Sequence, residues 1–290
     1  MIKENKKTGY VAVLGRPNVG KSTLVNSLVG EKISIVTSKP QTTQINVLGI
    51  VHNKESQIIF VDTPGLVTEK QMQFNSKALN REAVNALSQA DLVLMMVEAN
   101  VWKKTDDYIF KHLKEMSMQG ILVVNKVDRY KDKNKILDFL KDRSGNDVFI
   151  DTVPISALYE KNLIRLIEVI ERHLPIKSPE FDKDTVTDKD TFFRITEILR
   201  ERLMHHLRDE LPYSLDCSID NFEDKENIVM IDLLIKTKKD AHKKIIIGKG
   251  GSLLKQVGTE ARKEIETLVG KKVFLTTQVR SIKRGKNRGS

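Results

Sequence analysis

The chain has 290 residues, of which 40% are hydrophobic and 30% are charged, and its formal net charge is +10 at pH 7. This length allows one large domain or two ordinary ones, and the composition is that of a soluble globular protein without any apolar run long enough for a membrane span. The polar, basic residues 1–7 exclude a secretory signal and the single cysteine excludes an internal disulfide, so we expect a reducing, cytoplasmic compartment.

The basic excess is confined to one end of the chain. Residues 241–290 contain 13 Lys and Arg against 3 Asp and Glu, whereas residues 1–240 contain 36 of each and balance. The positive charge of residues 241–290 favours binding of a polyanion such as RNA. Anionic lipid would also be attracted to it, and a solvated basic tail is the plain alternative.

A β-prone apolar run at residues 10–14 is followed by the pattern G-x-x-x-x-G-K-[S/T] and then by apolar residues at helical spacing up to residue 29. This arrangement is typical of the phosphate-binding loop of P-loop NTPases. Its glycines let backbone N–H groups surround an anion, its lysine reaches the β- and γ-phosphates, and its serine hydroxyl binds Mg²⁺. The candidate residues are Gly15, Arg16, Pro17, Asn18, Val19, Gly20, Lys21 and Ser22.

A polar loop without a helical period, residues 33–44, follows the first predicted helix. Long irregular loops in compact domains are usually functional. In a P-loop GTPase this loop would be the first switch, in which a threonine closes on Mg²⁺ and the γ-phosphate. We select Thr43 for that role, with Thr42 as the second choice.

Two strands, at residues 45–51 and 57–61, lead to a D-x-x-G motif. Asp62 would be linked to Mg²⁺ and the N–H of Gly65 would meet the γ-phosphate, with Thr63 and Pro64 between them. The following residue, Leu66, cannot hydrogen-bond the attacking water as a glutamine would at this position.

Because Leu66 cannot orient the attacking water, another group must assist GTP hydrolysis. Two alternatives remain for Asn18: its amide oxygen helps to hold a K⁺ ion that neutralises charge on the leaving group, or the residue only stabilises the loop turn. The candidate catalytic residues are Asn18, Lys21, Thr43 and Gly65, and the candidate Mg²⁺ ligands are Ser22, Thr43 and Asp62.

Helices and strands alternate in the next part of the chain. Helices are predicted at residues 74–90 and 105–118, the second opened by Thr105 as N-cap, and buried strands at 92–97 and 121–124. A strand at 149–153 and a helix at 162–173 close this half. The pattern indicates the α/β class, with a mostly parallel sheet and helices on both faces.

The strand at 121–124 ends in the motif N-K-x-D, which selects the base. The carboxylate of Asp128 can accept hydrogen bonds from N1–H and the 2-amino group of guanine, whereas adenine offers neither donor there. Lys126 would lie along the base and the phosphate-binding loop, and Asn125 would tie these loops together. The candidate base-binding residues are Asn125, Lys126, Val127, Asp128, Ser156, Ala157 and Leu158, of which the last three match the backbone contact to the guanine carbonyl. In this order, the motifs are those of a Ras-like P-loop GTPase domain over residues 1–175.

The second half begins after a polar, acidic, Pro-containing linker at residues 176–190. A helix at 192–207 and paired strands at 214–222 and 228–235 precede a G-x-x-G turn, and a helix at 252–269 and a strand at 272–279 follow it. This order resembles a type II KH domain, an α+β unit that binds RNA, over residues 191–280, with a basic tail at 281–290. The candidate RNA-binding residues are Ile247, Gly248, Lys249, Gly250, Gly251 and Lys255.

One Ras-like domain followed by a KH domain resembles the Era-like family of bacterial GTPases. The resemblance covers residues 15–24, 41–43, 62–66, 125–128, 156–158, 210–214 and 245–251. It implies hydrolysis of GTP to GDP with Mg²⁺, binding to the 3′ end of small-subunit (16S) rRNA and to the pre-30S subunit during 30S biogenesis, and some peripheral contact with the cytoplasmic face of the cell membrane. We also expect a monomer. The chain departs from the family at Gln44, where an arginine is usual, and in its last strand, which lacks the usual tryptophan.

Two other functions are weighed against this one. The first is an RNA-binding scaffold whose nucleotide site is only structural, which the intact phosphate-contacting positions disfavour. The second is a tRNA-modification or tandem-type GTPase, which a single GTPase domain with a C-terminal KH unit disfavours.

Overall fold

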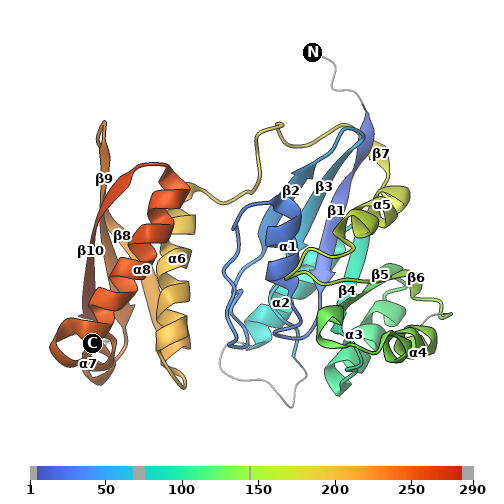
Figure 1. Ribbon diagram of the computed structural model, residues 1–290, viewed down its shortest axis with the longest axis horizontal. Coiled ribbons are helices and arrows are strands. Elements are labelled where there is room, and N and C mark those ends of the chain that lie inside the picture. Colours follow the sequence, from blue (N-terminus) through green and yellow to red (C-terminus); the bar gives the residue numbers. More distant parts are fainter. Residues whose placement is uncertain (1–4, 68–75, 144, 283–290) are drawn as a thin grey trace, which may run out of the picture. The chain divides into compact units, whose positions relative to one another are not determined.

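The computed structural model describes residues 5–67, 76–143 and 145–282, and the chain divides into two compact units, Met1–Asp188 and Lys189–Ser290 (Figure 1). Each unit has its own cluster of buried apolar side chains. Within the described ranges, no helix has both the length and the apolar character needed to cross a bilayer.

The first unit is organised around a sheet with strand order β2-β3-β1-β4-β5-β6, and β7 pairs with the free part of β1. Neighbours run parallel except in the pairs β2–β3 and β1–β7. The strands are β1 (Lys6–Leu14), β2 (Val47–His52), β3 (Ser56–Asp62), β4 (Leu92–Glu98), β5 (Gly120–Asn125), β6 (Phe149–Pro154) and β7 (Ile176–Lys177). The central strands β4 and β5 are almost entirely apolar and buried, as expected for a parallel sheet covered on both faces.

Among the described residues, helices and one short turn of 3₁₀ helix connect these strands. They are α1 (Lys21–Val29), α2 (Ser76–Ser88), α3 (Lys104–Glu115), η2 (Val127–Arg129), α4 (Lys133–Arg143) and α5 (Leu163–His173). One core cluster joins alternate residues of β1, β4 and β5 to apolar residues of α2 and α3. The expected α/β fold with a mostly parallel sheet is therefore confirmed.

The predicted N-cap of α3 is wrong. The helix begins at Lys104, and its N-cap is Lys103 rather than Thr105. The reason is the carboxylate of Asp106, which accepts a hydrogen bond from the Lys103 N–H at 2.8 Å and so supports a start two residues earlier. Residues 74 and 75 of the predicted helix 74–90 lie outside the described residues, and α2 is described from Ser76 to Ser88.

Residues 178–188, most of the predicted linker, bind to the sheet of the first unit. The N–H of Ile50 in β2 donates to Val186 O at 2.9 Å, and the N–H of Leu48 donates to the Asp188 carboxylate at 2.9 Å. Nearer the start of the segment, the N–H of Glu180 donates to the side-chain oxygen of Gln57 in β3 at 2.7 Å. The segment thus covers the edge of the sheet at β2, the strand that directly follows the predicted switch loop.

The second unit has a three-stranded sheet with order β10-β9-β8, in which β8 and β9 are antiparallel and β9 and β10 are parallel. Its elements are α6 (Thr191–His206), η3 (Leu211–Tyr213), β8 (Leu215–Asp224), β9 (Ile228–Thr237), α7 (Asp240–Ile247), η4 (Lys249–Gly251), α8 (Ser252–Val269) and β10 (Lys272–Ser281). Apolar residues of α6 and α8 pack on alternate residues of β9 and β10. The helix–strand–strand–helix–helix–strand order is the one expected for the KH unit. Residues 283–290, the rest of the predicted basic tail, lie outside the described residues.

Candidate nucleotide-binding and RNA-binding sites

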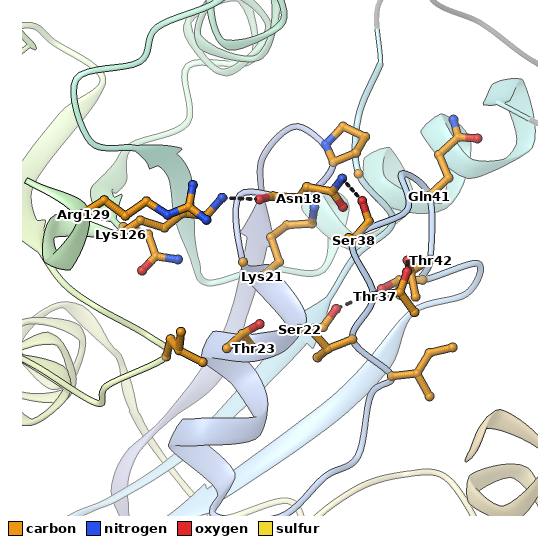
Figure 2. Close-up of a pocket in the computed structure, with 18 of the residues that line it drawn as sticks. Asn18, Lys21, Ser22, Thr23, Thr37, Ser38, Gln41, Thr42, Lys126 and Arg129 are labelled. Carbon is orange, nitrogen blue, oxygen red and sulfur yellow. Dashed lines mark hydrogen bonds between the residues drawn. The ribbon is translucent and has the colours of Figure 1, made fainter. Parts of the chain in front are cut away.

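A pocket of about 320 Å³ lies in the first unit beside the loops that follow strands β1, β3, β5 and β6 (Figure 2). Loops at the carboxyl ends of parallel strands are the usual place for a ligand in an α/β sheet. The switch loop forms the remaining wall. The predicted site residues that line the pocket are Pro17, Asn18, Gly20, Lys21, Ser22, Thr42, Thr43, Gly65, Asn125, Lys126, Asp128 and Leu158.

The backbone of the phosphate-binding loop requires glycine at both ends. Gly20 has φ of 105°, and a Cβ there would collide with the side-chain amide of Asn125. A Cβ on Gly15 would lie 2.6 Å from the carbonyl oxygen of Met96. Gly65 also packs closely against this loop, since a Cβ added at Gly65 would lie 2.8 Å from Pro17 Cα. The glycines of the motif are therefore required by close backbone packing.

Lys21 and Asp62 place opposite charges in the buried floor of the site. Lys21 is 6% exposed, and its ammonium donates to Gly15 O at 3.1 Å. Burial lowers the pKa of Lys21 to about 8, although the Asp62 carboxylate opposes that shift. Burial raises the pKa of the fully buried Asp62, with Lys21 and nearby hydroxyls acting in the opposite direction. An anion beside Lys21 would remove the cost of burying its charge.

The switch loop brings Thr43, not Thr42, to the end of the phosphate-binding loop. The hydroxyls of Ser22 and Thr43 lie 3.0 Å apart. Thr42 instead donates to Lys39 O at 2.8 Å and lies 2.6 Å from the hydroxyl of Thr37, so its side chain stabilises the switch loop itself. Of the two alternatives, the geometry favours Thr43.

Oxygen donors suited to Mg²⁺ converge at this point. Neither carboxylate oxygen of the buried Asp62 has a well-formed hydrogen bond among the described residues, although the hydroxyls of Ser22, Ser34 and Thr43 lie close enough to lower its pKa. Carboxylate and hydroxyl oxygens are the ligands that Mg²⁺ prefers, directly or through water. The residues present therefore fit the ion.

Asn18 joins three parts of the site. It has φ of 64°, its side-chain N–H donates to Ser38 O of the switch loop at 2.7 Å, and its own carbonyl oxygen accepts from the Lys126 ammonium at 2.7 Å (Figure 2). Its amide N–H is thus used to hold the switch loop, which leaves the amide oxygen as the group that could bind a cation.

The predicted base-binding loop is tied to the phosphate-binding loop as expected. The Asn125 amide donates to Val19 O at 2.8 Å and accepts the N–H of Ala157 at 2.9 Å, which confirms that Asn125 connects the three loops. The Ser156 hydroxyl donates to the Asp128 carboxylate. Asp128 itself is exposed on the wall of the pocket, where a base would cover it.

Several predicted residues support the pocket from behind instead of lining it. The side chain of Arg16 lies 3.3 Å from the Asp106 carboxylate, the Thr63 hydroxyl donates to Val13 O at 2.7 Å, and Leu66 is buried in the apolar core. The predicted residues outside the pocket lining are Gly15, Arg16, Val19, Asp62, Thr63, Pro64, Leu66, Val127, Ser156 and Ala157.

Three residues that sequence reasoning missed shape the site. Asn26 of α1 receives the N–H groups of Ile33 and Ser34 at 3.0 Å each and donates to Ser34 O at 2.7 Å, so it fixes the start of the switch loop. Ser27 donates to Ala157 O at 3.0 Å. Glu98 at the end of β4 binds the ammonium of Lys126. No local pattern signals these contacts, because their partners lie in other loops.

The second candidate site is the G-x-x-G turn between α7 and α8. Gly248, Gly250 and Gly251 have φ of 75°, 60° and 79°, in the region that favours glycine. A Cβ on Gly248 would lie 2.8 Å from Leu253 Cβ, whereas Gly250 and Gly251 face open space. Lys249 is exposed in the turn, and Lys255 is exposed one turn into α8. Ile247 is partly buried at the end of α7. A phosphodiester backbone can therefore approach the turn closely, beside two cations.

Comparisons with known proteins match both units of the chain. A family model described as "50S ribosome-binding GTPase" matches residues 10–126, and one described as "KH domain" matches residues 210–287. The protein named GTPase Era from Vibrio parahaemolyticus is 40% identical over 279 residues, which cover 96% of this chain and 87% of that protein. GTPase Era from Xylella fastidiosa (strain Temecula1) is 42% identical over 274 residues, covering 94% and 92%.

Two solved structures are similar over nearly the whole chain. One is Era in complex with MgGDPNP and nucleotides 1506–1542 of 16S ribosomal RNA, with a TM-score of 0.90, 35% identity and coverage of 98% of this chain and 96% of that one. The other is a variant of Aquifex aeolicus Era bound to GDP and AlF₄⁻, with a TM-score of 0.89, 35% identity and coverage of 97% and 96%.

Proposed function

Because the chain belongs to the Era family of GTPases, we propose that it hydrolyses GTP while bound to the 3′ end of 16S rRNA, as a step in assembly of the small ribosomal subunit. The observation that supports this proposal is a pocket in the first unit that brings together the phosphate-binding loop, the switch loop and residues 125–128, with an exposed G-x-x-G turn in the second unit. The family model that refers to the 50S subunit matches only the nucleotide-binding part, whereas a relative similar over the full chain was crystallised with 16S rRNA.

The phosphates would be bound by the backbone of residues 15–22 and by Lys21. The buried ammonium of Lys21 needs an anionic partner, which the β- and γ-phosphates supply. The N–H of Gly65 would contact the γ-phosphate, and Thr43 would close over it. When bound, Mg²⁺ neutralises charge on the β- and γ-phosphates. Ser22, Thr43 and Asp62 would hold it.

The base would lie between Lys126 and the loop after β6. Asp128 would accept hydrogen bonds from N1–H and the 2-amino group of guanine, oriented by the Ser156 hydroxyl. Because the Ala157 N–H is already bonded to Asn125, we assign the contact with the guanine carbonyl to the N–H of Leu158, which lines the pocket.

We further propose that Asn18 helps to hold K⁺ during hydrolysis. Its amide N–H is bonded to Ser38 O, so its amide oxygen is the group available for a cation next to the phosphates. A cation there would stabilise charge on the leaving group, which the buried Leu66 cannot do. GTP turnover should be faster in KCl than in NaCl of equal ionic strength, and equal turnover in the two salts would refute this role.

Residues 247–251 and Lys255 would contact the rRNA backbone. Coupling between the two sites requires that RNA bind the GTP and GDP forms with different affinities. The support for such coupling is the path of residues 178–188. They bind β2 immediately after the switch loop, and the second unit begins at the residue after Asp188. A rearrangement of the switch loop by the γ-phosphate would therefore move β2 and the segment 178–188 that is bonded to it.

The finer assignments extend the same proposal. We assign residues 1–175 to the GTPase domain, 176–190 to the linker, 191–280 to the KH domain and 281–290 to the basic tail. The protein would act as a cytoplasmic monomer with a peripheral contact to the cytoplasmic face of the cell membrane. The basic excess of residues 241–290 supports an affinity for anionic surfaces of either kind. Salt-dependent binding to rRNA and to anionic vesicles would separate the two.

The test of the proposed function is crosslinking. RNA crosslinked to the protein in its GTP-bound state should come mainly from the 3′ end of 16S rRNA. Recovery mainly of 23S rRNA, tRNA or mRNA would contradict the proposal.

A further inference from the structure

Glu98, the last residue of β4, contacts three cationic side chains, Arg16 of the phosphate-binding loop and Lys126 and Arg129 of the segment after β5. Its carboxylate is 3.0 Å from the Lys126 ammonium, 2.8 Å from Arg129 Nη1 and 3.6 Å from Arg16 Nη2. The Glu98 and Lys126 side chains are 16% and 20% exposed, whereas Arg129 is 58% exposed. Although burial opposes it, the two arginines and the lysine lower the pKa of Glu98, so the carboxylate is charged at neutral pH.

The Lys126 ammonium donates to two acceptors that come from different parts of the first unit. One is Glu98, and the other is the carbonyl oxygen of Asn18 at 2.7 Å (Figure 2). Lys126 also has φ of 64°, and its side chain reaches the carbonyl oxygen of Asn18 in the phosphate-binding loop. Together the two acceptors hold the aliphatic part of Lys126 across the wall on which the base would rest.

Electrostatics show why the carbonyl oxygen alone would not hold Lys126 there. Without the acid, the ammonium would share this partly buried space with the guanidinium group of Arg16, whose side chain is 10% exposed, and like charges repel. A long lysine side chain also gains rotamer entropy when it leaves for solvent. Glu98 offsets both effects, and its charge-assisted hydrogen bond is stronger than one to a neutral acceptor. The contact with Arg129 is exposed and contributes little.

We propose that Glu98 is a positioning residue for guanine nucleotide binding that acts through Lys126. The inference rests on the proposed function, in which residues 125–128 bind the guanine base. It goes further by assigning a role to an acid on β4 that belongs to neither the phosphate-binding nor the base-binding motif. The role concerns the base side of the site, so GDP and GTP should depend on it equally.

The competing explanation is that these ions only stabilise the fold. A structural role would lower thermal stability and would affect the nucleotide whether or not Lys126 is present. A positioning role instead predicts that the effect disappears once Lys126 can no longer respond. A double-mutant cycle separates the two explanations.

The experiment measures the Kd for GDP and for a non-hydrolysable GTP analogue with the full chain. The variants are wild type, Glu98→Gln, Lys126→Met and the double variant. Glu98→Gln keeps the side-chain shape and removes the charge. We expect about tenfold weaker binding of both nucleotides, since hydrogen bonds to charged groups contribute at that level. We also expect kcat at saturating GTP to change by less than about twofold, because the phosphate-contacting groups are untouched.

In the Lys126→Met background, Glu98→Gln should cause no further loss. The matched control is Glu168→Gln, which removes the same charge from an exposed ion pair with Arg165 on α5 and should leave both Kd values unchanged. Glu98→Asp keeps the charge on a shorter side chain and should fall between wild type and Glu98→Gln. Glu98→Asp also replaces Glu98→Gln in the binding measurements if Glu98→Gln does not fold.

Wild-type affinity in Glu98→Gln, or in Glu98→Asp if that variant has to replace it, would overturn the inference. So would a double variant whose loss equals the product of the two single losses. A wild-type protein that failed to prefer guanine nucleotides would refute the proposed function itself, which is a distinguishable result.

Discussion

The buried ammonium of Lys21 makes nucleotide affinity depend on pH in a window that can be calculated. Its pKa is lowered from 10.5 to about 8 by burial, and an anion bound beside it restores the charged form. Binding therefore takes up a proton wherever the free protein has lost one, and affinity falls as the pH rises through 8. With a pKa of about 8, the protonated fraction falls from roughly 90% at pH 7.0 to roughly 25% at pH 8.5, so the Kd for GDP should rise about fourfold.

The assay is equilibrium binding of GDP at constant ionic strength between pH 7.0 and 8.5. In this window the terminal phosphate of GDP is ionised and guanine keeps its N1 proton, so the ligand does not change. The Lys21→Arg variant is the control, because arginine stays charged and whatever affinity remains should not vary with pH. A wild-type Kd that stayed constant or fell as the pH rose would show that the charge of Lys21 does not control GDP affinity in this range.

The same shift has a consequence for stability. The folded-state pKa of Lys21 lies below its unfolded value, so the unfolded chain binds more protons between pH 8 and 10.5. The contribution of this group to the free energy of unfolding therefore rises with pH in that window. The bound nucleotide should abolish this rise, since it keeps the lysine charged in the folded protein.

Three further predictions concern single substitutions. Asp128→Asn should weaken GDP binding by on the order of a hundredfold and improve binding of xanthosine diphosphate, because an amide can donate to the oxygen on C2 of xanthine; an unchanged preference in a competition assay would count against the base assignment. Gly20→Ala should weaken GDP binding by on the order of a hundredfold, as its Cβ displaces the Asn125 amide, and calorimetry showing wild-type affinity would contradict the packing argument. Asp190→Ala removes the N-cap that accepts the Phe193 N–H at 2.7 Å, so amide exchange in α6 should quicken about fivefold, for about 1 kcal/mol, and unchanged exchange would show that the cap is not needed.

The parts of the fold that the sequence predicts well are those with strong local periodicity. Continuous apolar runs mark β4 and β5, and the helix predicted at residues 252–269 coincides with α8. Helix α4 is not predicted, because among its residues only Ile136 is buried and the apolar stripe is too weak to recognise. Strand β7 is likewise missed, since two residues paired with Lys6 and Lys7 have no pattern of their own.

In the candidate site as well, the sequence predicts some residues and misses others. Motif spacing predicts the residues that face the ligand, such as Lys21 and Asp128, because the chemistry of phosphate and guanine restricts their identity. The sequence favours Thr43 over Thr42 only narrowly, and the 3.0 Å contact between the hydroxyls of Thr43 and Ser22 supports the same choice. Contacts such as that between Lys126 and Glu98 join residues 28 positions apart, and only the folded sheet brings them together.

In the proposed function, the bound nucleotide controls the affinity of the protein for rRNA. The most direct measurement is the affinity of the protein for an RNA with the 3′-terminal sequence of 16S rRNA, at one fixed salt concentration, with either a non-hydrolysable GTP analogue or GDP bound. We expect the RNA to bind at least about fivefold more tightly when the GTP analogue is bound than when GDP is bound, because fivefold is the lower end of ordinary coupling between two sites. Equal affinity in the two nucleotide states would contradict it.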